Sequence, residues 1–318
     1  MEDRLVPLNA LIGLVTPHDV NPASLTTHGF RLVALEVPVM TTSGKVMIDA
    51  VLYSNVTNRL IACESKSGAN IEREQAERYA ALAVNNVVLG ARVDMRGRAS
   101  PSLDVLYVCQ EQHVERITLG LGEIDLNVGV LAAGRTKIEL HNADYACDAL
   151  REAFASPLLL KAPPPRYIPF DHESPVPEVV PPVRAALVRS LARRLPQISL
   201  TSLAEECAPH YALYAPQPQG QLRKRVEEAA RQVCNESPDT FELVPRGNNR
   251  DGMVRILDHP EDRDRRGRTM VYKKLARRSG GAGTPHPSPY EQPDLLELLE
   301  QADESDRETT EDQEEESS

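Results

Sequence analysis

The sequence of 318 residues predicts two folded domains of different class, an α/β domain followed by a mainly α-helical domain. Three observations predict this. Strand-like and helix-like segments are mixed in the first half of the chain, whereas the second half opens with three helix-like segments. A Pro-dense stretch, residues 161–182, lies between them. The end of the chain, residues 279–318, is acidic and of low complexity, so we expect it to be disordered.

The first domain, residues 1–160, begins with a helix and three consecutive strand-like runs. These runs are rich in Val, Ile and Leu, and they cover residues 31–39, 45–54 and 59–65. Turn-forming segments, TTSG and NVTN, separate them. Residues 69–89 have the apolar spacing of a helix, and residues 102–110 form a further buried strand. The order helix, three strands, helix, strand predicts a central mixed sheet flanked by helices.

The Pro-dense stretch is expected to be a linker without a regular helix, because proline interrupts helices and central strands. Beyond it, three helix-like segments cover residues 183–195, 199–214 and 220–234. Strand-like runs then cover residues 240–245 and 252–257 around the turn segment RGNNRD, and residues 269–275 are a further candidate. Three helices followed by a basic hairpin is the order of a winged-helix domain, which we place at residues 183–278.

Composition argues against several classes of protein. The five cysteines are scattered and form no CxxC pair, which favours a reducing, cytoplasmic environment over a disulfide framework or a zinc finger. The eight histidines form no HExxH motif, and no Gly-rich phosphate loop is present. The first residues lack the pattern of a signal peptide, and no apolar run is long enough for a membrane span.

The formal net charge of −11 conceals two segments of opposite charge. Residues 279–318 carry 13 acidic residues and one basic residue, whereas residues 182–278 carry 19 basic and 12 acidic residues. A basic domain beside an acidic tail favours a polyanionic partner for the domain.

The segment IACESKSG, residues 61–68, places two opposite charges at the end of an apolar strand. Glu64 and Lys66 are two residues apart, so they share one face of that strand. Asp49 lies in the preceding strand among apolar neighbours, where burial is costly without compensation. If the two strands pair, Asp49 and Glu64 converge, and such carboxylates repel unless they share a proton or a cation. Oxygen ligands of this kind suit Mg²⁺.

These residues resemble the PD-(D/E)XK nuclease superfamily, which has the restriction-endonuclease-like fold. The resemblance covers about residues 25–110, and a Gln-x-x-x-Tyr element on the following helix, Gln75 to Tyr79, is similar to the exonuclease-like branch. The resemblance implies that Asp49, Glu64 and the backbone carbonyl of Ser65 bind Mg²⁺ or Mn²⁺, and that Lys66 positions or activates the attacking water.

Three further residues have open roles. Gln75 and Tyr79 are expected to pack and support the site, and direct participation in the chemistry is the alternative. Glu36, in the first strand, is the nearest candidate for the additional acid that many superfamily members carry on their leading helix. The motif itself is short, and two alternatives to an active nuclease stay open: a catalytically inactive nuclease fold, and a structural ion pair in an unrelated fold.

The second domain carries candidate residues for double-stranded DNA. Three basic residues at the expected start of the third helix are in the position of a recognition helix: Arg223, Lys224 and Arg225. Arg246 and Arg250 flank the hairpin turn, where a wing would contact phosphate. Protein contacts are the alternative use of such a domain. With no Trp and only four Phe, stacking of single-stranded bases is not favoured.

The sequence therefore predicts a metal-dependent DNA endonuclease with a winged-helix-like DNA-binding domain. Phage defence or restriction, and cleavage within a transposition or repair machine, are the expected settings; an inactive assembly or regulatory protein is the alternative. Further subunits are candidate partners through the acidic tail, where Leu295–Leu299 has the spacing of a short helix. If the tail does not bind a partner, it either only keeps the protein solvated or competes with DNA for the surface of the basic domain. A homodimer stays open.

Overall fold

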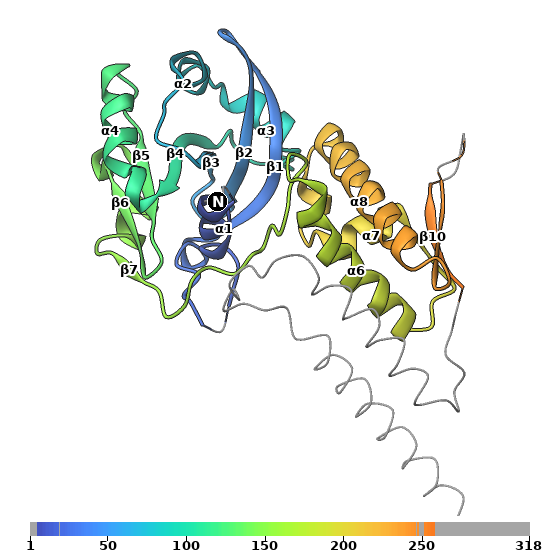
Figure 1. Ribbon diagram of the computed structural model, residues 1–318. Helices are drawn as coiled ribbons and strands as arrows, with labels where there is room; N and C mark the ends of the chain where they lie inside the picture. The colour runs from blue at the N-terminus through green and yellow to red at the C-terminus, as the bar shows by residue number, and fades with distance from the viewer. Residues whose placement is uncertain (1–4, 19, 246, 248–250, 258–318) are drawn as a thin grey trace, which may run out of the picture. The chain divides into compact units, whose positions relative to one another are not determined.

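The computed structural model describes residues 5–18, 20–245, 247 and 251–257 (Figure 1). By its internal contacts the chain divides into two compact units. Of the described residues, the first contains those within 5–171 and 208–221, and the second contains those within 172–207 and 222–257.

A mixed seven-stranded sheet forms the centre of the first unit, and its strands lie in chain order from β1 to β7. The strands are β1 (Phe30–Thr41), β2 (Gly44–Ser54), β3 (Arg59–Lys66), β4 (Ser102–Gln110), β5 (Gly129–Ala133), β6 (Lys137–His141) and β7 (Leu158–Leu159). Strands β3, β4 and β5 are parallel to one another, and every other neighbouring pair is antiparallel. The predicted α/β class with a mixed sheet is confirmed.

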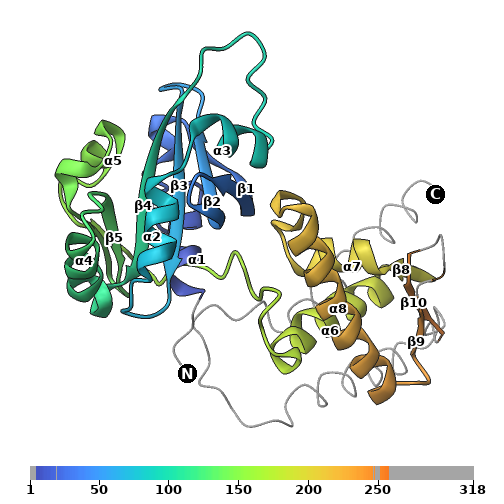
Figure 2. The same cartoon turned by 90° about the horizontal axis from the view of Figure 1, so that it is seen from above.

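Helices flank this sheet (Figures 1 and 2). They are α1 (Val6–Gly13), α2 (Arg73–Ala80), α3 (Val84–Gly90), α4 (Val114–Glu123) and α5 (Asp148–Ala153), with 3-10 turns η1 (Thr26–His28), η2 (Glu111–His113) and η3 (Ala143–Tyr145). Leu60 and Ala62 of β3 face the core under α2 and α3, whereas Ile61 and Cys63 are equally buried outside that cluster. Helix α1 contacts β3, β4 and β5.

The single helix expected over residues 69–89 is wrong, because two short helices replace it. Helix α2 ends at Ala80 and α3 begins at Val84, and Ala83 between them is extended, with φ −97° and ψ 132°. The break lets α3 pack closely on β1: a Cβ added at Gly90 would lie 2.8 Å from a methyl group of Val37. Burial of the α3 valines against the sheet therefore stabilises the fold more than one continuous helix would.

The second unit combines helices with a small antiparallel sheet. Its elements are α6 (Val176–Ala192), β8 (Gln197–Ser199), α7 (Leu200–Cys207), α8 (Pro216–Glu236), β9 (Phe241–Val244) and β10 (Met253–Ile256); the first residues of α8 and η4 (Tyr211–Leu213) belong to the first unit by their contacts. The strand order is β8-β10-β9. Strand β8, just before α7, was not expected from the sequence.

The expectation that residues 161–182 hold no regular helix is wrong, because α6 begins at Val176 and contains Pro181 and Pro182. Each internal proline removes one backbone hydrogen bond of the helix. Burial compensates for this loss, since Val179 and Val183 are fully buried.

The expected second and third helices have different bounds in the structure. Helix α7 ends at Cys207, because Pro209 disfavours the helical conformation in the residue before it. Helix α8 begins at Pro216, since proline is tolerated in a first turn whose N–H groups have no helical partner. The basic triplet that starts at Arg223 thus lies well inside α8 and does not open the helix, contrary to expectation.

Several predicted features fall outside the described residues: Arg246 and Arg250 at the hairpin turn, the strand candidate at 269–275 and the acidic tail at 279–318. Within the part of the chain that the structure does describe, no helix combines the length and apolar character needed to cross a membrane.

Candidate active site

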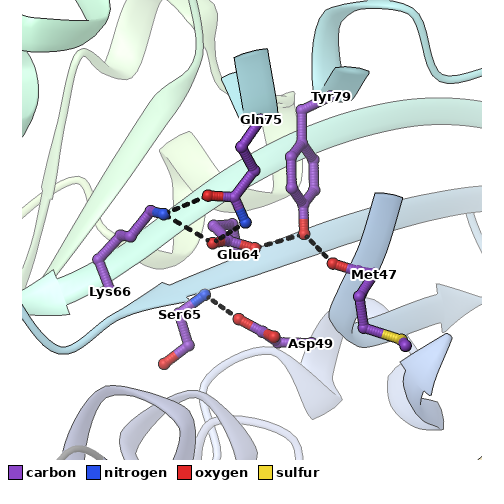
Figure 3. Close-up of polar contacts among 7 residues, drawn as sticks. All are labelled: Met47, Asp49, Glu64, Ser65, Lys66, Gln75 and Tyr79. Carbon is purple, nitrogen blue, oxygen red and sulfur yellow. Dashed lines mark hydrogen bonds and ion pairs between the residues drawn. The ribbon is translucent and has the colours of Figure 1, made fainter. Parts of the chain in front are cut away.

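The candidate site lies where β2 and β3 separate. The two strands pair from Ser54 and Arg59 up to Ala50 and Cys63. Beyond this point β2 continues along β1, and β3 continues along β4. The hairpin therefore opens into a fork, and Asp49 and Glu64 are the first residues past the last pair (Figure 3).

The regular pleat is interrupted at the same level of the sheet. One core cluster takes Val46 and Ile48 from β2 before this level but Val51 and Tyr53 after it, so the alternation of side chains shifts once between them. On β1 the facing residue is Glu36, which lies between the partners of Ile48 and Ala50 and has a left-handed φ of 47°. That conformation costs about 1–2 kcal/mol in a residue other than glycine.

Asp49 points into the fork. Its Oδ2 atom accepts a hydrogen bond from the backbone N–H of Ser65, over 2.6 Å. Burial raises the pKa of the Asp49 carboxyl well above its ordinary value; Glu64 raises it further, the hydrogen bond from Ser65 lowers it, Glu36 raises it and Lys66 lowers it. Burial and the neighbouring carboxyl groups therefore disfavour the ionised form of Asp49.

Glu64 is 4% exposed and is held by two side chains of α2. Its Oε1 atom accepts a hydrogen bond from Gln75 Nε2 over 2.7 Å, and its Oε2 atom lies 2.6 Å from the Tyr79 hydroxyl. That hydroxyl is also 3.1 Å from the carbonyl oxygen of Met47, and its single proton serves one acceptor at a time. Gln75 and Tyr79 thus contact the candidate carboxylate directly, which fits a supporting role better than remote packing (Figure 3).

Lys66 completes the cluster. Its Nζ atom lies 3.0 Å from Glu64 Oε1 and donates a hydrogen bond to Gln75 Oε1. Its side chain is 13% exposed, so the ammonium group keeps limited access to solvent. Lys66 therefore pairs with Glu64, and its positive charge also acts on the Asp49 carboxyl.

The donor set suits a hard divalent cation. Two carboxyl groups converge at the fork, and a cation would offset the repulsion that raises the pKa of Asp49. In a β-strand the N–H and C=O of one residue point to the same edge, so the carbonyl of Ser65 points to the Asp49 side, as its N–H does. In the described ranges, no three His, Cys, Asp or Glu side chains surround a common metal position. Asp49, Glu64 and the Ser65 carbonyl would therefore hold the cation with water.

Sequence reasoning missed two tyrosines. Tyr107 on β4 is the register partner of Glu64, and its ring centroid lies 5.8 Å from that of Tyr79. Its hydroxyl is buried and has no hydrogen-bond partner among the described residues. The second is Tyr214, from residues 208–221 far along the chain, which forms a parallel bridge with Leu35, the residue before Glu36. A tyrosine in an apolar run reads as core, so no sequence signal marked either residue.

The predicted DNA-binding residues that the structure describes lie on α8. Lys224 is exposed and Arg223 is half-buried. Arg225 has structural partners: its Nε donates to the carbonyl oxygen of His172 over 2.9 Å, and its Nη1 lies 3.0 Å from Glu228. Their role in DNA binding stays a prediction.

Replacing Asp49 by Asn is expected to stabilise the protein in the absence of divalent cations. The folded-state pKa of Asp49 lies above its ordinary value of 3.8, so its ionisation lowers the free energy of unfolding as pH rises from about 4 through the folded pKa. Asn removes this charge and still accepts the Ser65 hydrogen bond. Thermal melting in chelator should show a gain at pH 8 that shrinks toward pH 5, with about 2–4 °C for each 1 kcal/mol.

The matched control is Asp94→Asn. Hydrogen bonds from Arg96 lower the pKa of that exposed carboxyl, so its removal should give no gain in melting temperature. A lower melting temperature for Asp49→Asn than for the wild type at pH 8 would contradict the repulsion at the fork.

Replacing Tyr79 by Phe is expected to destabilise the protein by about 1–3 kcal/mol, because the buried Glu64 loses a hydrogen-bond donor. Tyr107→Phe is the contrast, because that hydroxyl has no partner among the described residues. Its removal should be neutral or stabilising. Urea unfolding of both variants tests this, and equal losses would show that the Tyr79 hydroxyl does not hold Glu64.

Comparison with known proteins gives one match. The family model of the MJECL32 domain matches residues 4–172, which contain Asp49, Glu64, Lys66 and the whole sheet. No curated protein and no solved structure matches the chain. The description of the family states no activity, so the function is argued from the site alone. On the extent of this match, the chain belongs to the MJECL32 domain family.

Proposed function

We propose that the first unit is a divalent-cation-dependent DNA endonuclease of the PD-(D/E)XK type. The observation that carries this proposal is the fork between β2 and β3, which brings together Asp49, Glu64 and Lys66. A buried Glu64 carboxylate beside the Asp49 carboxyl is costly to keep for stability alone. Backbone strain at Glu36, on the same level of the sheet, is also typical of a functional site.

The arrangement of the first unit supports this proposal. A leading helix, three antiparallel strands, a helical segment and a strand parallel to the third follow one another as α1, β1, β2, β3, α2–α3 and β4. This order agrees with a restriction-endonuclease-like fold.

In the proposed reaction, Asp49 and Glu64 would hold a Mg²⁺ or Mn²⁺ ion through their carboxylate oxygens. Such an ion would polarise the phosphate as a Lewis acid and would lower the pKa of a bound water. Gln75 and Tyr79 fix the orientation of Glu64 from α2, so that its oxygens are preorganised. Lys66 donates hydrogen bonds to the attacking water or to the charged phosphate oxygens.

For the second unit we propose a winged-helix domain that positions the duplex. Strand β8 lies between the first two helices and pairs with the hairpin of β9 and β10, which supports this assignment. Lys224 is exposed on α8, the helix that would approach the major groove. Association with further subunits of a defence or transposition complex is part of the same proposal.

A catalytically inactive scaffold is the second candidate. One observation favours it: both oxygens of Glu64 already accept hydrogen bonds, and Oε1 also pairs with Lys66. Binding a cation would require Lys66 or Gln75 to give up part of this contact.

Supercoiled plasmid distinguishes the two candidates. The purified chain should nick or linearise the plasmid in Mg²⁺ or Mn²⁺ and should lose this activity in excess chelator. If the chain retards duplex DNA but leaves the plasmid intact in both cations, the inactive scaffold is supported and the nuclease proposal fails.

A further inference from the structure

A segment from the second half of the chain joins the outer edge of the sheet in the first unit. Residues 208–221 belong to the first unit by their contacts, although the chain on both sides of them belongs to the second. Tyr214 forms a parallel bridge with Leu35 of β1, and the N–H of Ala215 donates to the Leu35 carbonyl over 3.1 Å. The segment thereby gives β1 a neighbour at its otherwise unpaired edge.

This bridge lies beside the carboxyl groups of the fork. Leu35 pairs with Ala50, and Ala50 pairs with Cys63, so these residues form one row across the sheet that Tyr214 extends. On one side of this row, the adjacent residue of each strand is an acid: Glu36 after Leu35, Asp49 before Ala50 and Glu64 after Cys63. Tyr214 therefore borders the carboxylate row at its β1 end.

The Tyr214 side chain is a neutral hydrogen-bond donor beside the acids of the fork. The residue is 4% exposed, and its hydroxyl is not one of the buried polar atoms that lack a partner among the described residues. Burial raises its pKa well above the ordinary value of 10, and the charges of Glu36, Asp171 and Asp49 raise it further. The hydroxyl therefore keeps its proton at neutral pH.

We propose that Tyr214 is a substrate-contacting residue of the fork, where its hydroxyl donates a hydrogen bond to a phosphate oxygen of the bound nucleic acid. This inference rests on the proposed nuclease function. A neutral donor suits the position, because it binds an anionic oxygen without adding charge to a row of acids. Since the phosphate gains negative charge during hydrolysis, the hydrogen bond strengthens in the transition state and acts on kcat.

Tyr214→Phe tests the inference, because it removes only the hydroxyl. Single-turnover cleavage of a duplex at saturating protein should be about 10- to 100-fold slower, the effect of one hydrogen bond to a charged group. The duplex Kd measured in Ca²⁺ and the melting temperature should stay at wild-type values. Tyr145→Phe is the matched control, because Tyr145 is half exposed and lies in η3, and it should cleave like the wild type.

Ala215→Pro gives an independent test of how the tyrosine is placed. Proline deletes the N–H that donates to Leu35, and Tyr214 already has the extended conformation (φ −69°, ψ 146°) that precedes proline. This variant should reproduce the slower cleavage although Tyr214 itself is intact.

The outcomes separate this inference from the proposed function. Wild-type rates for Tyr214→Phe, or a weaker duplex Kd with an unchanged rate, would overturn the role of Tyr214 and leave the nuclease proposal standing. A wild-type protein that does not cleave would end the nuclease proposal, and the role of Tyr214 in it would fall as well.

Discussion

Replacing Glu64 by Gln or Lys66 by Met is expected to reduce DNA cleavage by about a thousandfold or more. Gln cannot supply the second anionic oxygen ligand, and Met keeps the apolar stem of Lys66 but removes its charge. Both side chains are nearly the size of the originals, so the core around α2 should remain packed. Cleavage of supercoiled plasmid in Mg²⁺ and Mn²⁺, followed over several hours, measures this effect.

Two controls make this result specific to the fork. Glu74→Gln, one turn before Arg78 on the exposed face of α2, removes an equivalent charge and should keep wild-type cleavage. Melting temperature and duplex Kd report the integrity of each variant. If Glu64→Gln cleaves as fast as the wild type, the catalytic assignment of the fork is wrong.

Reversing Arg223 and Lys224 to Glu is expected to weaken duplex binding by about 10-fold or more at low salt. Each phosphate contact releases about 0.9 counterions. The slope of the logarithm of the association constant against the logarithm of the salt concentration should therefore become shallower by about one or two. Arg225 is left unchanged, because its contacts with His172 and Glu228 would also be lost. Fluorescence anisotropy of a labelled duplex between 50 and 300 mM salt measures both quantities.

The matched control changes the same charge elsewhere. Arg96→Glu with Arg151→Glu alters two exposed arginines of the first unit, each of which already has an acidic neighbour. This pair should change the affinity less than the α8 pair and leave the salt slope nearer the wild-type value. Equal effects of the two pairs would assign α8 to protein contacts or to the fold.

The strands around the fork follow from local sequence patterns. Val- and Ile-rich runs between turn segments gave bounds within two residues of β1, β2 and β3. The charged residues of the fork could also be predicted from the sequence, because Asp49 and Glu64 are acidic residues within strands that are otherwise largely apolar. Their convergence required only that the strands pair as a hairpin, which they do.

Other features depend on tertiary contacts that no local pattern encodes. The alternation of β2 shifts between Ile48 and Val51, opposite Glu36 with its positive φ, and a two-residue period cannot indicate such a shift. The prolines of α6 are tolerated through burial, which is a property of the folded unit. Tyr214 joins β1 from about 180 residues away in the chain, and only the structure brings them together.

The central claim is that Asp49 and Glu64 hold a divalent cation at the fork, and titration of the protein with Mn²⁺ followed by electron paramagnetic resonance tests it most directly. Bound Mn²⁺ loses the signal of the free ion, so the measurement counts occupied sites. The wild type should bind Mn²⁺ saturably, and the double variant Asp49→Asn, Glu64→Gln should lose that binding, while Asp94→Asn, Glu74→Gln retains it. Identical Mn²⁺ binding by the wild type and the fork variant would contradict the claim.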